Sequence, residues 1–331
     1  MEDQGDVRRG TYPHAEAAGN AAENIETARQ KLAQAKAKEN ASVASREYNL
    51  SSEALKDYQE VVLLSKQNIK DLYSRSGVEI RDEDFAELHL LRPQLSGGQK
   101  KEMGTYISNI HSAYVPVVGG ASFFEDAVAI YHELLHSVGR HAEVVMEGGE
   151  SFGGQSGYAT IVKEGVIKRS MGKVPEEGMA TYFANKFALE SNSETMKRAR
   201  ANYVQHAESN RELGNEDRNK VSRMNQQEKE DYICRVMIQK KQPPEYTNAE
   251  RLIGALIQGA ARSDQDPSTG PQMEASLLRS RVLTQNRSDL MQRIDSAFGD
   301  GTTREIFRLG FDSPYKIESV VRKLESQVYG Q

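Results

Sequence analysis

Apolar side chains recur at steps of three and four along much of this 331-residue chain, which is the spacing of amphipathic helices. One stripe runs from Leu55 to Leu72 and stops near Gly77, and a second runs from Phe124 to Val138. The hydrophobic pattern therefore predicts a protein built mostly from helices that pack through one apolar face.

Local signals bound the helix that the second stripe predicts over residues 122–138. Ser122 and Glu125 fit a capping box, in which each side chain satisfies a free backbone amide of the first turn. Gly139 follows the last apolar residue, and we expect it to stop the helix in a left-handed conformation.

Strand signals are fewer than helix signals. Residues 114–118 predict a short strand, and Pro116 suggests an edge position because proline has no amide to donate to a second neighbour. Residues 158–169 predict a β-hairpin that turns at Glu164-Gly165. Residues 83–113 are expected to form two further helices.

The chain divides into three parts by composition. Its beginning is rich in Ala, Lys, Glu and Gln and predicts an exposed helical or partly disordered arm. We therefore expect an α+β, predominantly helical fold with an arm over residues 1–75, a core over 76–200 and a helical carboxy-terminal subdomain over 201–331.

The sequence His-Glu-Leu-Leu-His lies in the last turns of the helix predicted at 122–138. Residues four apart share one helix face, so His132 and His136 can bind the same divalent ion. Glu133 is placed to take a proton from water whose pKa zinc lowers to about 7. The alternative is that both histidines are partly buried helix residues bonded to backbone, with Glu133 in solvent.

A hydrolytic zinc site usually has three protein ligands and one open position, so a third ligand is needed. The best candidate is Glu177, which follows Pro175 and Glu176 at the predicted start of another helix. Proline fits the first helical position, and acidic side chains suit the positive end of the helix dipole. The alternative is that Glu176 and Glu177 are only favourable charges in a first turn.

Together, His-Glu-Leu-Leu-His and the downstream Glu-Gly-Met-Ala-Thr-Tyr resemble the gluzincin group of zincin metallopeptidases, over about residues 114–190. In that group a downstream helix of the form E-G-x-A-x-Y contributes a glutamate ligand. The resemblance implies that His132, His136 and Glu177 bind Zn²⁺. It also implies that Glu133 is the general base and that the core at 76–200 is zincin-like.

The chain departs from the gluzincin pattern at one position. Some gluzincins orient the first histidine with an aspartate four residues after the ligand glutamate, and here that residue is Thr181. Glu176 lies outside the match and is expected either to support a ligand from behind or to be solvated. The threonine hydroxyl can accept a histidine N–H, but it lacks the charge of a carboxylate.

A rival third ligand is His141, because His132, His136 and Gly139 also match the start of the metzincin motif. The third histidine of that motif comes ten residues after the first, whereas His141 comes nine residues after it. We therefore expect His141 either behind the ligands or at the rim of the site. Arg140 is a candidate for stabilising negative charge, although the helix dipole alone also explains it.

The residue that would stabilise the oxyanion is left open by the sequence. Gluzincins often use a tyrosine or histidine that follows the ligand glutamate. Five candidates of this kind follow it here: Tyr182, Tyr203, His206, Tyr232 and Tyr246.

Composition narrows the possible partners and the compartment. A net charge of −5 argues against nucleic acid as a main partner. The single cysteine, Cys234, cannot form an internal disulfide, which fits a reducing compartment. We find no secretory signal and no stretch near the roughly 20 apolar residues that span a bilayer. We expect a cytoplasmic protein, with export by another route left open.

These observations favour a zinc-dependent metallopeptidase that hydrolyses peptide bonds in a peptide or protein substrate. Two alternatives stay open. One is a catalytically inactive zincin-fold interaction protein that binds a partner through its amino-terminal helical arm. The other is an exported effector protease that cleaves one particular protein.

Overall fold

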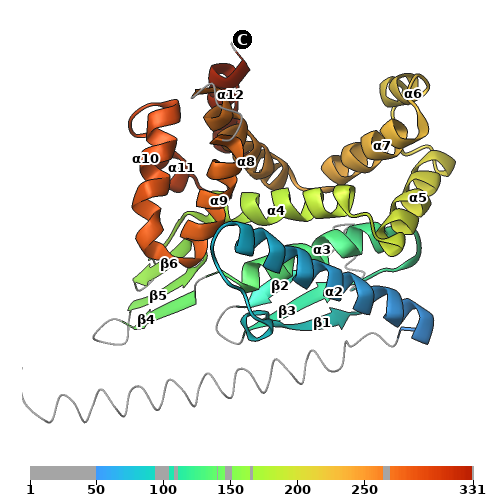
Figure 1. The fold of residues 1–331 in the computed structure, drawn as a ribbon, viewed down its shortest axis with the longest axis horizontal. Coiled ribbons are helices and arrows are strands. Elements are labelled where there is room, and N and C mark those ends of the chain that lie inside the picture. The colour runs from blue at the N-terminus through green and yellow to red at the C-terminus, as the bar shows by residue number, and fades with distance from the viewer. Residues whose placement is uncertain are drawn as a thin grey trace, which may run out of the picture. The chain divides into compact units, whose positions relative to one another are not determined.

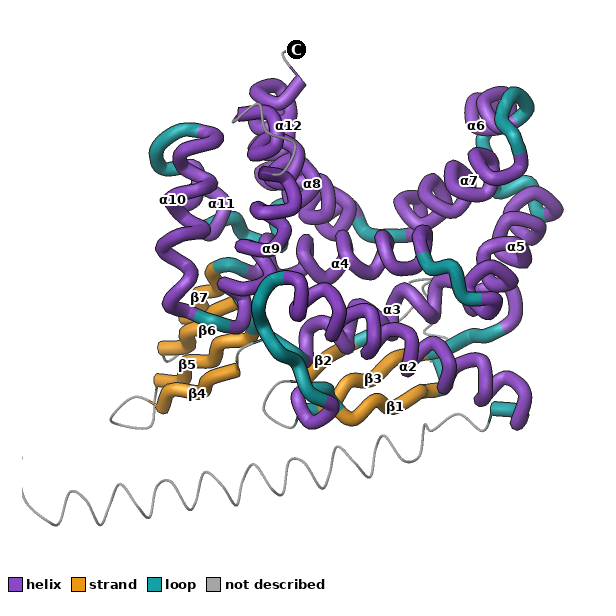
Figure 2. Tube along the Cα trace, viewed as in Figure 1, coloured by secondary structure: helices purple, strands orange, loops and turns teal. Residues whose placement is uncertain are grey.

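The computed structural model describes residues 50–93, 104–107, 111–139, 141–145, 151–164, 167–263 and 269–329. These residues all belong to one compact unit. They are predominantly helical, with two small β-sheets, so the expected mostly helical α+β class is confirmed (Figures 1 and 2). Most of the predicted amino-terminal arm lies outside the described residues.

Helix α2 (Ser52–Arg75) confirms the first apolar stripe. Its amino-terminal cap is Ser51, whose hydroxyl accepts from the backbone N–H of Ala54 at 3.3 Å. The face that packs against the rest of the chain is buried, and it contains Tyr58, Val61, Ser65, Ile69, Leu72 and Tyr73.

A three-stranded sheet follows, made of β1 (Glu87–Leu91), β2 (Thr105–Ile107) and β3 (Ser112–Pro116). The order is β1-β3-β2, with β1 parallel and β2 antiparallel to β3. The prediction of two helices in this region was wrong, because β1 and β2 are held by pairing with a strand that follows them in sequence. Such pairing overrides local periodicity.

The strand at 114–118 exists, but its predicted edge position was wrong. β3 is the central strand of the described sheet, and Pro116 is its last residue. The ladder continues past the proline, since the backbone N–H of Val117 donates to the carbonyl of Leu91 at 3.0 Å.

Helix α3 (Phe123–Ser137) carries the His-Glu-Leu-Leu-His motif in its last turns, as predicted. The capping box was wrong, because the Ser122 side chain makes no cap bond. Glu125 instead accepts from the Tyr203 hydroxyl at 2.8 Å. Gly139 was also misassigned, since it is not among the glycines with a left-handed backbone.

A second, antiparallel sheet fills the interval between α3 and the next helix. Its strands are β4 (His141–Val145), β5 (Ser151–Ser156), β6 (Ala159–Glu164) and β7 (Ile167–Met171), in that order. The predicted hairpin corresponds to β6 and β7 and is confirmed.

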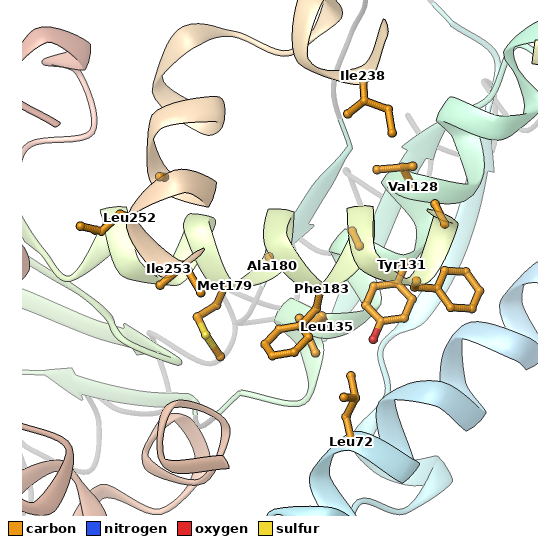
Figure 3. Packing of buried hydrophobic residues seen from close by; sticks show 14 of the residues in the cluster. Leu72, Val128, Tyr131, Leu135, Met179, Ala180, Phe183, Ile238, Leu252 and Ile253 are labelled. Atoms are coloured by element: carbon orange, nitrogen blue, oxygen red, sulfur yellow. The ribbon is translucent and has the colours of Figure 1, made fainter. Parts of the chain in front are cut away.

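Helix α4 (Lys173–Glu190) runs between α3 and α8 (Pro244–Ser263) (Figure 1). Figure 3 shows Tyr131 and Leu135 of α3 packed against Phe183 of α4, with Ile253 of α8 beside Met179. A helix buried on several sides needs apolar residues around most of its circumference, as this one has. The prediction that Pro175 is the first helical residue was wrong. The helix begins at Lys173, so Pro175 is its third residue.

The remaining helices complete the carboxy-terminal half. They are α5 (Glu194–Ser209), α6 (Asn215–Val221), α7 (Gln226–Lys241), α9 (Thr269–Val282), α10 (Arg287–Phe298), α11 (Thr302–Phe307) and α12 (Pro314–Tyr329). One hydrophobic core runs from α2 to α12 without a break at the predicted boundaries near residues 75 and 200. Within the described part of the chain, no helix combines the length and apolarity that a bilayer span requires.

Candidate metal centre

The last turns of α3 and the first turn of α4 bring three side chains together. Nε2 of His132 and Nε2 of His136 are 3.0 Å apart, and Oε2 of Glu177 is 3.3 Å from each of them. All three side chains are mostly buried. Among the described residues, this is the one group of His, Cys, Asp and Glu side chains that converges closely enough to hold a metal ion.

The donor set fits zinc. Two imidazole nitrogens and one carboxylate oxygen are the ligands of many hydrolytic zinc sites, which keep a fourth position open. Tetrahedral ligands at about 2.0–2.1 Å from one ion lie roughly 3.3 Å from one another. The observed separations of 3.0–3.3 Å match that spacing closely. The geometry therefore suits the predicted ligand set, whose metal binding stays a prediction.

Packing between α3 and α4 fixes this geometry. The rings of Tyr131 and Phe187 stack with their centroids 4.7 Å apart. Leu134 and Leu135, between the two histidines, are fully buried, as are Ala180 and Ala184 of α4. His132, His136 and Glu177 all project from these two close-packed helices. Their positions are therefore set by the core and not by flexible loops.

The charges in the cluster support one another. Burial lowers the pKa of His136, but the carboxylates of Glu177 and Glu176 outweigh it and raise that pKa to about 10. Burial opposes ionisation of Glu177, yet the two histidines hold its pKa well below the usual range. Glu177 is therefore an anion at neutral pH, as a metal ligand must be.

Glu133 lies beside the cluster and is itself buried. Burial raises the pKa of its carboxyl group, while His132 and His136 pull that pKa down. The backbone N–H of Tyr106 in β2 donates to this carboxylate. A Cβ placed on Gly104 would be 2.8 Å from Cγ and Oε1 of Glu133, so the start of β2 passes directly against the side chain.

Glu176 proves to be a buried support for the cluster and is not solvated. Its Oε1 accepts from Nδ1 of His136 at 2.9 Å, and its Oε2 accepts from the backbone N–H of Tyr158 at 2.9 Å. Arg281 of α9 donates to both oxygens through Nε, at 3.0 and 2.9 Å, and also through Nη2. Of the two expectations for Glu176, the structure favours support from behind a ligand.

Sequence reasoning missed Arg281, which lies 105 residues after Glu176. The available signal was a charge on an apolar stripe, since Arg281 follows Met273 and Leu277 at helical spacing in α9. Such a residue is expected to be buried only when it is paired. Its partner is encoded too far away in sequence for spacing to identify.

The structure describes three further residues that the sequence singled out to different extents. Thr181 is buried, and its hydroxyl has no hydrogen-bond partner among the described residues, so it does not take the role of the gluzincin aspartate. His141 is the first residue of β4, and its side chain lies outside what the structure describes. Arg140 lies outside the described residues altogether.

One of the five candidates for an oxyanion donor lies at the cluster. The ring centroid of Tyr246, in α8, is 6.1 Å from that of His132. Burial, together with the charges of Glu177 and Glu133, raises the pKa of the Tyr246 hydroxyl, which therefore stays protonated and able to donate.

The other four candidates make contacts elsewhere. The hydroxyls of Tyr203 and Tyr232 donate to Glu125 and Asp217, respectively. His206 contacts Asn210 and Glu212, which follow the last residue of α5. Tyr182 lies edge-on to Phe183 of its own helix.

Comparison with protein-family models, curated proteins and solved structures found no match. The function therefore has to be argued from the chemistry of the site itself.

Proposed function

We propose that this protein is a zinc-dependent metallopeptidase. The observation that carries the proposal is the convergence of His132 Nε2, His136 Nε2 and Glu177 Oε2 within hydrogen-bond distance of one another. In this proposal the three side chains hold zinc, and Glu133 is the general base. The resemblance to gluzincins assigns the same roles to these positions.

When bound, zinc would supply Lewis acidity that lowers the pKa of water and polarises a carbonyl group. Glu133 would take the proton from the attacking water and pass it to the leaving amine. Its burial raises its pKa, which brings a carboxyl group closer to the operating pH and improves it as a proton carrier. Tyr246 would donate its hydroxyl hydrogen to the oxygen on which negative charge develops.

The position of β2 supports a peptide as the substrate. β2 pairs with β3 on one side, and the N–H of Tyr106 faces Glu133 on the other. Within the described sheet it is an edge strand. An extended peptide would add to such an edge through main-chain hydrogen bonds, which would bring its carbonyl groups past the cluster.

The proposal is tested with the full-length protein, zinc and a library of peptides from a digested proteome. We expect the wild type to cleave members of the library. Glu133→Gln should retain zinc and lose turnover by at least about 10²-fold, the usual contribution of a general base.

Glu53→Gln serves as a matched control, because Glu53 is exposed in the first turn of α2, and it should behave as wild type. Cleavage at the wild-type rate by Glu133→Gln would contradict the assignment of the base. Failure of the zinc-loaded wild type to cleave any library member would contradict the metallopeptidase proposal.

A further inference from the structure

Arg281 is a fully buried cation that reaches the cluster from a helix far away in sequence. Besides Glu176, it contacts two other elements. Nη1 donates to the Leu135 carbonyl of α3 at 2.7 Å and to the Tyr73 hydroxyl of α2 at 2.9 Å. A buried guanidinium is tolerated only when it is paired and hydrogen-bonded. These contacts meet that requirement and join α9 to three helices.

The acceptors of Arg281 lie on two sides of His136. Leu135 is the residue immediately before His136, so its carbonyl fixes the backbone from which the imidazole projects. Glu176 holds the far nitrogen of the same ring, since its Oε1 accepts from Nδ1 at 2.9 Å. The Arg281 guanidinium thus constrains the backbone next to His136 directly and the orientation of the His136 ring through Glu176.

The pairing also separates the roles of two adjacent carboxylates. Glu177 faces the Nε2 atoms of the two histidines, whereas Glu176 faces Nδ1 of His136 and Arg281. A planar guanidinium binds a carboxylate through more than one N–H, which fixes the plane of the carboxylate as well as its charge. Glu176 is therefore held as an acceptor for the ring and away from the side on which Glu177 lies.

We propose that Arg281 is a positioning residue of the metal centre, acting from α9 through Glu176 to fix the tautomer and orientation of His136. The inference rests on the proposed zinc site. With Nδ1 donating to Glu176, Nε2 is the nitrogen that faces Glu177 and His132, and a bound metal would take the place of its proton. The carboxy-terminal helices are then part of the centre and not a separate appendage.

The turn between β5 and β6 packs directly against the Glu176 carboxylate. The backbone N–H of Tyr158 donates to Oε2, and a Cβ on Gly157 would overlap that oxygen at 2.1 Å. The carboxylate thus has buried donors from α3, α9 and the second sheet. These donors hold the Glu176 carboxylate in one orientation. A carboxylate that positions His136 has to be fixed in this way.

The test compares zinc affinity among purified full-length variants by competition with a chromophoric chelator. Arg281→Met removes the charge while keeping much of the volume, and we expect zinc affinity to fall by about 10–100-fold, the usual effect of losing the support of a ligand. Arg281→Lys keeps a charge but cannot span the same acceptors, so an intermediate loss is expected.

A double variant separates positioning from folding. In Arg281→Met combined with Glu176→Gln, both buried charges are gone, but the amide oxygen at position 176 still accepts from Nδ1. We expect it to bind zinc more tightly than Arg281→Met alone. In the Co²⁺-substituted proteins, the visible spectrum of Arg281→Met should differ from wild type, because it reports the arrangement of the ligands.

Arg200→Met is the matched control. Arg200 is also buried, but its guanidinium donates to the carbonyls of Ala188 and Ser191 at the far end of α4, at 2.8 and 2.9 Å. Its loss should lower stability and leave zinc affinity unchanged. A merely structural role for Arg281 predicts the same behaviour from both arginine variants.

The outcomes distinguish this inference from the proposed function. If the wild type binds no zinc, the proposed site fails and the inference fails with it. If the wild type binds zinc and a folded Arg281→Met binds it equally well with an unchanged cobalt spectrum, only the positioning role is overturned. Should Arg281→Met fail to fold, Arg281→Lys decides: weakened zinc binding with a native melting transition supports the role, and wild-type affinity overturns it.

Discussion

Nδ1 of His136 and Oε1 of Glu176 lie 2.9 Å apart in a buried hydrogen bond. The acceptor is the residue immediately before Glu177, the candidate third ligand. In the gluzincin pattern an aspartate one turn further along the helix supports the first histidine, and Thr181 occupies that position here. This chain instead supports the second histidine, and it does so with the other member of the Glu176-Glu177 pair.

Replacing Gly157 with alanine should destabilise the protein by more than backbone strain alone. Gly157 has a φ of +55°, and a Cβ there would be 2.1 Å from Oε2 of Glu176. The left-handed backbone costs a residue with a side chain about 1–2 kcal/mol. Displacing the carboxylate from its donors should add about 1–3 kcal/mol. Urea unfolding followed by circular dichroism measures the sum.

Gly120→Ala is the control for that experiment. Gly120 has nearly the same φ, +57°, but nothing lies within 4 Å of the position that its Cβ would take. It should therefore show the strain without the collision. Equal losses of unfolding free energy in the two variants would mean that Glu176 is not held against this turn.

Gly104→Ala should reduce turnover while leaving zinc in place. The new Cβ would come within 2.8 Å of Oε1 of Glu133, so the carboxylate has to move, but the flexible side chain allows the fold to form. A displacement of about 1 Å in a reacting group can cost about 10²-fold in rate. The measurement is kcat with zinc content determined on the same sample.

Gly254→Ala provides the comparison, because nothing lies within 4 Å of its Cβ position in α8. It should leave turnover unchanged and stabilise the helix by about 0.5–1 kcal/mol. If Gly104→Ala turned over as fast as Gly254→Ala, the contact between β2 and Glu133 would have no bearing on the reaction.

Tyr246→Phe should lower kcat/KM by about 10²-fold and leave zinc affinity unchanged, since the ring that packs near His132 is retained and only the hydroxyl is lost. Tyr182→Phe, on the ligand helix but turned toward Phe183, should be near wild type. The opposite ranking of the two variants would assign the oxyanion donor elsewhere.

Cys234 should react with a thiol reagent only when the protein opens. Its side chain is fully buried in α7, and burial raises its pKa to about 12, so very little thiolate is present at pH 8. Labelling by a chromogenic disulfide should be slow in buffer and rapid in denaturant. Stoichiometric labelling of the native protein within seconds would show that α7 is not packed into the common core.

The helices and the ligand set were predictable because their signals are local. The steps of three and four in α2 and α3, and the four-residue interval between His132 and His136, are properties of one helix. Glu177 could be proposed from a short motif with a chemical requirement behind it. The structure places these side chains together, as that requirement predicts.

The missed features depend on contacts that are distant in sequence. β1 and β2 are short strands that exist by pairing with β3, so the local sequence of residues 83–113 wrongly predicted helices. The predicted capping box does not form, and the Glu125 carboxylate accepts from the Tyr203 hydroxyl and pairs with Lys241, both of which are distant in sequence. Arg281 could not be matched to Glu176, because no periodicity links a turn of α9 to a turn of α4.

The most direct test of the central claim is the metal content of the purified protein, measured by elemental mass spectrometry in wild type, His132→Ala and Glu177→Ala. His141→Ala is included because that histidine was the rival ligand. We predict one zinc per chain in wild type and in His141→Ala, and its loss or sharp weakening in the other two. A wild-type protein that holds no zinc after reconstitution, or a Glu177→Ala variant that holds it as tightly as wild type, would contradict the three-ligand centre.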